Sequence, residues 1–165
     1  MDYAALTKGA ILGVVGGLAG TVVMDLALFG TLFTVGLPAV IDFSTIGNTA
    51  AGFFALLGVN IAGGLPLGLA VYHLLGSVLG GAYGAAASRV GALRTGAIKK
   101  GVVLAVVYIE VLSQPIALTA PIILKMTVTE TLQWLGVSAA MHLIWGIVLG
   151  FVVSYGLRPA AGFFL

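Results

Sequence analysis

Charged residues are scarce in this sequence. They make up 7% of its 165 residues, whereas 61% are hydrophobic and the mean hydropathy is +1.21. A soluble domain carries roughly 25% charged residues, so this chain has too few charges to cover a surface that faces water. Lipid is the solvent that suits such a composition, and the sequence therefore predicts an integral membrane protein.

Cysteine is absent, and several motifs are missing with it. Without cysteine the chain cannot form disulfides, hold an iron–sulfur cluster by thiolates or use thiol catalysis. Its 7 Lys and Arg residues, with a net charge of +2, are too sparse for a surface that binds nucleic acid. No glycine-rich loop is followed by Lys-Ser or Lys-Thr, which excludes a phosphate-binding P-loop. These absences favour a protein that is not an enzyme.

Four long apolar runs dominate what is present. Each has the 20 or so apolar residues that cross about 30 Å of hydrocarbon as a helix, at ~1.5 Å per residue. No long polar linker separates them. We therefore predict one all-α domain over residues 1–165, a bundle of four transmembrane helices. Its spans cover residues 8–36, 65–88, 98–120 and 135–157.

Two of the connections between these runs carry predictions of their own. Residues 37–64 form a long apolar connection, in which residues 49–59 predict a short helix in the membrane interface or part of a re-entrant segment. Between the third and fourth runs, Pro115 and Pro121 predict an interrupted helix, because proline lacks the amide hydrogen that a helix needs. The polar stretch 126–134 predicts a separate short surface helix.

Basic residues gather on one side of the predicted membrane. Only Lys125 falls on the other side. Because Lys and Arg are enriched in cytoplasmic loops, we predict that both termini are cytoplasmic, and we expect the plasma membrane as the location. The six residues on the predicted cytoplasmic side are Lys8, Arg89, Arg94, Lys99, Lys100 and Arg158.

A weak internal repeat relates the two halves of the chain. His73 precedes Arg89 by 16 residues, and His142 precedes Arg158 by the same number. A Lys-Gly pair also opens both the first and the third run. Two tandem helical hairpins related by an axis along the membrane normal would explain the repeat. Chance is the alternative explanation, because apolar sequences align easily.

Glycines recur every fourth residue in three of the runs. Residues four apart lie on one face of a helix, and small residues there let two helices approach closely. We interpret these stripes as helix-packing faces; the alternative is that they leave room for a flat cofactor or a substrate path. The stripes comprise Gly9, Gly13 and Gly17, then Gly76, Gly80 and Gly84, and finally Gly146 and Gly150.

Four ionisable residues fall inside the predicted spans: Asp25, His73, Glu110 and His142. Each costs about 2.5 kcal/mol or more in hydrocarbon, so we expect all four to face the bundle interior and to find partners there. Counted from the basic residues at ~1.5 Å per residue, Asp25 and the two histidines share one depth in the outer half of the membrane, and Glu110 lies nearer the middle.

Four interpretations of this cluster are open. In the first, Asp25 pairs with one histidine while Glu110 is protonated or bonded to a neighbour, which fixes the helix register. In the second, His73 and His142 are the axial ligands of a b-type haem. In the third, these histidines and Asp25 bind a metal such as zinc, iron or copper. In the fourth, the carboxyl and imidazole groups carry protons during transport.

Almost nothing of the chain is left outside the membrane for catalysis or ligand capture. We therefore expect a non-catalytic structural or accessory subunit of a larger membrane complex. Its partners would be the lipid bilayer and either other membrane subunits or further copies of itself. The alternatives are a small proton-coupled transporter or channel-like unit, and an electron carrier with haem b.

Overall fold

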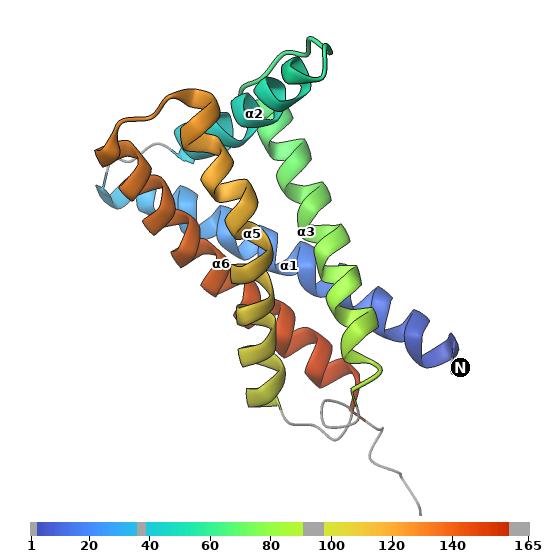
Figure 1. Cartoon of the computed structure of the whole chain (residues 1–165). Coiled ribbons are helices and arrows are strands. Elements are labelled where there is room, and N and C mark those ends of the chain that lie inside the picture. Colours follow the sequence, from blue (N-terminus) through green and yellow to red (C-terminus); the bar gives the residue numbers. More distant parts are fainter. Residues whose placement is uncertain (1–2, 36–38, 91–97, 159–165) are drawn as a thin grey trace, which may run out of the picture.

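The structure is a computed structural model that describes residues 3–35, 39–90 and 98–158. These residues form five helices and no strand (Figure 1). Four of the helices, α1, α3, α5 and α6, are long and apolar enough to cross a membrane, so the predicted four-helix membrane bundle is confirmed. The predicted span end at Gly36, residues 37–38 of the connection and Arg94 lie outside the described residues. The helices are α1 (Tyr3–Val35), α2 (Ala39–Leu56), α3 (Leu65–Ala87), α5 (Ile98–Leu124) and α6 (Val128–Gly156).

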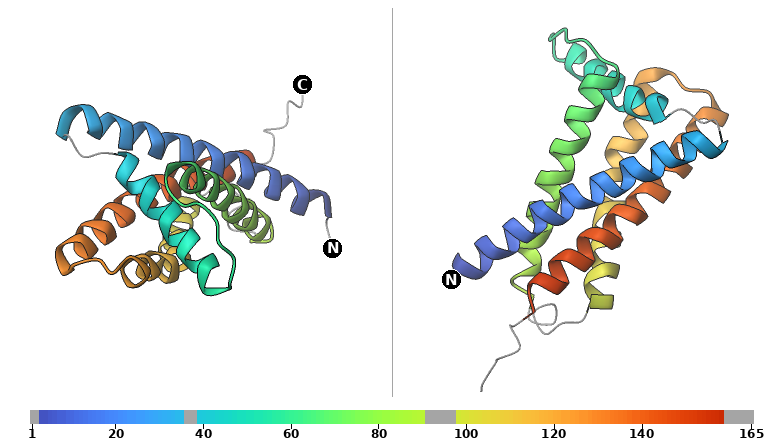
Figure 2. Two further views of the ribbon diagram at one scale, coloured as in Figure 1. Left: turned by 90° about the horizontal axis from the view of Figure 1, so that it is seen from above. Right: turned by 180° about the vertical axis from the view of Figure 1, so that it is seen from behind.

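α1 and α3 are antiparallel and touch backbone to backbone. A Cβ atom added to any of three glycines of α1 would overlap the carbonyl oxygen of a glycine of α3. α1 crosses α3 obliquely, as the two views of Figure 2 show. Residues without a side chain permit this close approach of two helices. The glycines in contact are Gly9 with Gly84, Gly13 with Gly80, and Gly17 with Gly76.

α5 continues through both of its prolines, so the predicted interruption is wrong. Pro121 has no amide hydrogen to donate to the carbonyl oxygen of Ala117, four residues earlier. The indole Nε1 of Trp134 donates to that oxygen instead, at 2.8 Å, and a neighbouring helix thus satisfies the freed carbonyl. The separate surface helix predicted at 126–134 is also wrong, because α6 begins at Val128 and runs on into its span.

Local chemistry fixes the start of α6. The hydroxyl of Thr127 accepts a hydrogen bond from the backbone N–H of Glu130 at 3.3 Å. The carboxylate of Glu130 in turn accepts one from the backbone N–H of Thr127 at 2.7 Å. This reciprocal capping box satisfies two donors that a helix leaves unpaired at its first turn, and it places the polar stretch of the sequence at a helix start.

α2 lies across one end of α3 and α5 (Figure 1). It begins ten residues before the short helix predicted at 49–59, so that prediction had the wrong bounds. A Cβ atom on Gly68 of α3 would overlap the carbonyl oxygen of Phe43 on α2. The side-chain oxygen of Asn48 accepts from the N–H of Gly64 at 2.8 Å, which ties α2 to the start of α3.

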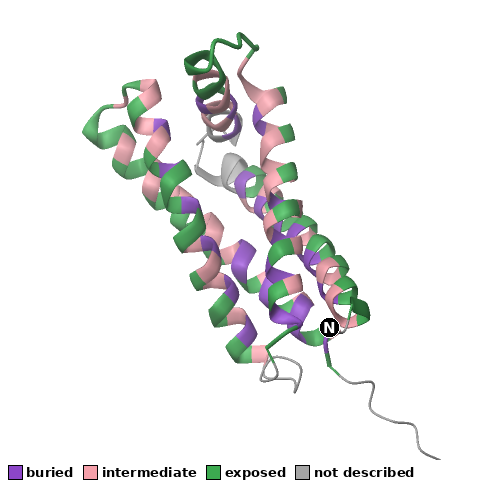
Figure 3. Ribbon diagram, turned by 45° about the vertical axis from the view of Figure 1, so that its right-hand side comes forward, coloured by how far each residue is buried: buried purple, intermediate pink, exposed green. Residues whose placement is uncertain are grey.

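The α1–α3 and α5–α6 hairpins pack closely along one side only. α1 packs along α6, where Gly16 faces Leu149 and Gly20 faces Trp145. α3 and α5, in contrast, make few contacts with each other. A twofold axis that exchanged the hairpins would make these two interfaces alike, so the arrangement is not symmetric. Exposed residues cover the outer faces of the helices and buried residues face inward (Figure 3).

Candidate functional site

Asp25 and His73 form a carboxyl–imidazole pair between α1 and α3. Oδ2 of Asp25 lies 3.3 Å from Nε2 of His73. Nδ1 of His73 lies 2.9 Å from the carbonyl oxygen of Leu69, and since that oxygen can only accept, Nδ1 carries a hydrogen. A single proton therefore joins Asp25 to Nε2. Either an imidazolium donates to a carboxylate, or a neutral carboxylic acid donates to a neutral imidazole.

The Asp25–His73 pair lies at the edge of the bundle rather than deep inside it. The His73 side chain is 38% exposed and that of Asp25 is 20% exposed. Oδ1 of Asp25 is buried and has no hydrogen-bond partner among the described residues. The pair thus uses one carboxyl oxygen to join two helices, as the first interpretation of the cluster expects.

In the α5–α6 hairpin, His142 of α6 is paired with a hydroxyl group of α5. Its Nδ1 lies 3.0 Å from Oγ of Ser113 on α5. Both residues line a cavity of about 110 Å³ between α3 and α5, and neither Asp25 nor His73 is part of its wall. Most of the wall is apolar or aromatic. Its residues include Met24, Tyr72, Leu79, Ile109, Met141 and Trp145.

Glu110 has its partner on its own helix. The side-chain nitrogen of Gln114, one turn later on α5, donates to a carboxyl oxygen of Glu110 at 3.4 Å. Gln114 is exposed and Glu110 is half-buried. Glu110 comes 10 residues after Lys100, which places it about 15 Å along the helix and therefore at hydrocarbon depth. This pair lies on the outer side of the bundle. The sequence predicts instead that the Glu110 carboxyl group faces the bundle interior.

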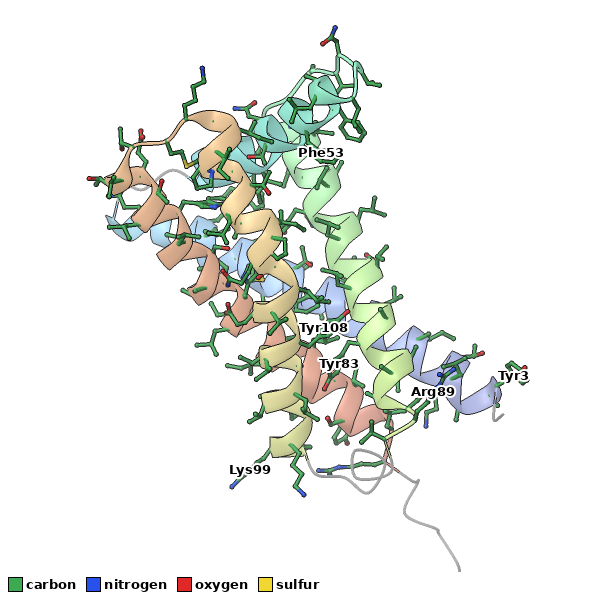
Figure 4. The ribbon with its side chains drawn as sticks, in the orientation of Figure 1. Tyr3, Phe53, Tyr83, Arg89, Lys99 and Tyr108 are labelled. Carbon is green, nitrogen blue, oxygen red and sulfur yellow. The ribbon has the colours of Figure 1, made fainter. Side chains whose placement is uncertain are left out.

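Two tyrosines that the sequence did not single out tie α3 to α5. The hydroxyl of Tyr83 donates to the carbonyl oxygen of Gly101 at 2.6 Å, and the hydroxyl of Tyr108 donates to the carbonyl oxygen of Leu79 at 2.9 Å. Their rings lie 5.4 Å apart, between the two helices (Figure 4). Tyrosine in an apolar run is a weak signal, because tyrosine is also common at membrane interfaces.

The arrangement does not fit the two ligand-binding interpretations of the histidines. Both ring nitrogens of His73 already face protein oxygens, and His142 belongs to a different site whose cavity is much smaller than a porphyrin. Within the described part of the chain, no three residues among His, Asp and Glu lie close enough together to hold a metal ion. The geometry therefore gives no support to a shared haem or metal at His73 and His142.

Comparison with known proteins adds no functional assignment. No protein-family model matches this chain, and no curated protein and no solved structure is significantly similar to it.

Proposed function

We propose that this chain is a non-catalytic subunit of a larger membrane assembly, and that the outer face of α5 binds another transmembrane helix. The observation that carries the proposal is the Glu110–Gln114 pair, which lies on the outside of the bundle at hydrocarbon depth. A charged or strongly polar side chain in lipid costs several kcal/mol, about 2.5 or more. A helix that offers a hydrogen-bonding group at the same depth would remove that cost.

The surroundings of the pair support the same conclusion. Pro115 lacks an amide hydrogen, so the carbonyl oxygen of Val111 has lost its helical donor on this side of α5. The polar pair is also flanked on α5 by a strip of apolar, exposed residues at helical spacing. The apolar residues of this strip, which we call the α5 outer face, are Val103, Val107, Val111, Leu118 and Ile122.

Site-directed cross-linking in native membranes tests the proposal. The chain has no cysteine, so a single introduced cysteine reports one position. We expect Val107→Cys, on the α5 outer face, to cross-link to a partner chain or to a second copy. Val78→Cys on α3 is the matched control, because Val78 and Val107 are similarly exposed, at 57% and 53%. Equal cross-linking at both positions would contradict the proposal.

A double variant tests whether the Glu110–Gln114 pair is what holds the partner helix on the α5 outer face. Replacing both members, with Glu110→Leu and Gln114→Leu, leaves a face that lipid tolerates. We expect this variant to fold, to lose the cross-link at Val107→Cys and to run at the mass of one chain on a native gel. A wild-type chain that already runs alone in mild detergent would refute the assembly.

We also propose that both termini are cytoplasmic and that the membrane is the plasma membrane. Arg89 and Lys99 lie at the end of the bundle where α3 ends and α5 begins (Figure 4). Lys125 lies at the opposite end, in the turn between α5 and α6. In intact cells, an impermeant thiol reagent should label Lys125→Cys and leave Lys99→Cys unlabelled. The reverse pattern would invert the orientation.

A further inference from the structure

Helices surround the cavity between α3 and α5 on most sides. α1 and α6 form its back wall through residues such as Met24 and Trp145, and Ile46 of α2 contributes at one end. Towards the other end, the Tyr83 and Tyr108 hydroxyl groups join α3 to α5. Between these two ends, α3 and α5 make few contacts with each other. The remaining side is therefore the slot between these two helices.

The exposure of the lining residues locates the mouth. Met24 and Trp145 at the back are each 3% exposed, whereas Ile116 on α5 is 48% exposed. Ile116 follows Lys100 by 16 residues, which places it about 24 Å along the helix. Because α3 and α5 both span the membrane, a mouth at this level opens to lipid hydrocarbon and not to water.

Five of the polar side chains of the wall are already bonded within the protein, and the hydroxyl groups of Tyr72 and Ser138 line it as well. The Thr21 hydroxyl and the Trp145 indole both donate to the carbonyl oxygen of Gly17, at 2.9 and 3.0 Å. Trp134 donates to Ala117, and His142 faces the Ser113 hydroxyl group. What these groups leave towards the cavity is mainly methyl, methylene and ring surface. Water needs two to four polar partners to occupy a cavity, so an apolar occupant suits this one better.

The volume agrees with an apolar occupant of modest size. The cavity measures about 110 Å³, and an engineered apolar cavity of about 150 Å³ in another protein binds benzene or xenon. A segment of several methylene groups fits this space, with the rest of the molecule remaining outside the mouth. Hydrocarbon chains of that kind surround the slot in a bilayer.

We propose that one lipid acyl chain enters between α3 and α5 and fills this cavity. The chain would lie against Met24, Met141 and Trp145, and pass Ile116 to rejoin the bilayer. This site is distinct from the α5 outer face and does not depend on assembly with a partner. A monomer in a lipid bilayer should therefore show it.

The tryptophans of the chain make the proposal measurable. The sequence has 2 Trp, and both line the cavity. In a Trp134→Phe variant the remaining Trp145 is almost completely buried, so lipid outside the bundle does not touch it. Bromine atoms on an acyl chain quench tryptophan at short range. In bilayers of phosphatidylcholine brominated on its acyl chains, we expect Trp145 to lose about half of its emission relative to unbrominated lipid.

Filling the cavity should abolish this quenching. Ala117→Leu adds three carbon atoms at a buried lining position, and we expect it to restore most of the Trp145 emission in brominated lipid. Ala86→Leu is the matched control, because Ala86 is exposed on α3 and is not part of the wall; its quenching should equal that of the parent. If Ala117→Leu does not fold, Ser138→Leu, at a less buried lining position, replaces it. Absence of quenching in the parent would overturn the proposal. Equal quenching in the cavity-filling variant and in Ala86→Leu would also overturn it.

Discussion

The α1–α3 and α5–α6 hairpins each carry a histidine 16 residues before an arginine, yet the two histidines have different kinds of partner. His73 faces the carboxyl group of Asp25 across the first hairpin. His142 faces the hydroxyl group of Ser113 across the second. In both hairpins the histidine joins its helix to the preceding spanning helix. A common sequence pattern has thus led to one carboxyl–imidazole pair and one hydroxyl–imidazole pair.

The two hairpins also differ in how their helices pack against each other. In the first, glycines lie on both helices and the backbones touch. In the second, the glycines of α6 mainly face the backbone of valines on α5: an added Cβ on Gly146 would lie 2.7 Å from Cα of Val106, and one on Gly150 would lie 2.5 Å from Cα of Val102. The first hairpin is therefore closed by its own backbone contacts. The second hairpin also has close backbone contacts, with valine opposite glycine, and its α5 helix contributes to the cavity wall and carries the polar outer pair.

The largest effect should come from adding one methyl group to the first hairpin. Gly13→Ala places a Cβ atom against the carbonyl of Gly80, and a backbone atom cannot rotate away as the end of a side chain can. Overpacking of this kind costs about 1–3 kcal/mol, and we expect a loss of unfolding free energy at the upper end of that range. Reversible unfolding in mixed micelles would measure it.

The control for this variant lies in the second hairpin. Gly136 on α6 has open space where its Cβ would be. Gly136→Ala should therefore be neutral or stabilise the helix by up to about 1 kcal/mol, because alanine loses less conformational entropy on folding. Equal losses for Gly13→Ala and Gly136→Ala would show that the glycine contacts of the first hairpin contribute nothing special.

A smaller difference should separate the two polar pairs. A double-mutant cycle on Asp25 and His73 should give a coupling energy near the upper value measured for bonds between membrane helices, about 1.7 kcal/mol. A cycle on Ser113 and His142 should give the average value of about 0.6 kcal/mol. The carboxyl group makes the difference, because leaving it unpaired costs more than leaving a hydroxyl unpaired. A larger coupling in the second hairpin would reverse this ranking.

The spans were predictable because hydropathy and length alone determine them. The run at 65–88 corresponds to α3 at Leu65–Ala87 within one residue. The partners of the histidines were harder to predict, because helical spacing gives depth but not the direction in which a neighbouring helix lies. Asp25 was at the right depth for either imidazole, and only the packed bundle selects His73. The outward position of Glu110 was missed for the same reason.

The end of α5 shows a second reason why prediction from the sequence failed. The expected effect of a proline was cancelled by a residue that lies far away in the sequence. Proline removes a donor and so predicts a helix break. At Pro121 that donor is replaced by Trp134, 13 residues later in the sequence and on another helix. The sequence contains both residues but does not state that they meet. The first hairpin needs no such repair, because the only proline of α3, Pro66, lies in its first turn, where the N–H has no helical acceptor.

The smallest effect, and the most specific to the second hairpin, should come from this replacement of a donor. Trp134→Phe removes the indole N–H and should cost about 0.6 kcal/mol of unfolding free energy, the average for such bonds in membrane proteins. Pro121→Ala restores a backbone N–H that can donate to the same carbonyl oxygen of Ala117. The gain in stability from Pro121→Ala should therefore be larger in the Trp134→Phe background than in the wild type, by about the energy of the lost bond. Pro115→Ala provides the comparison, because its new N–H reaches a different carbonyl and should give the same gain in both backgrounds. If Pro121→Ala also gave equal gains, the indole would not be the substitute donor, and the continuity of α5 past Pro121 would need another cause.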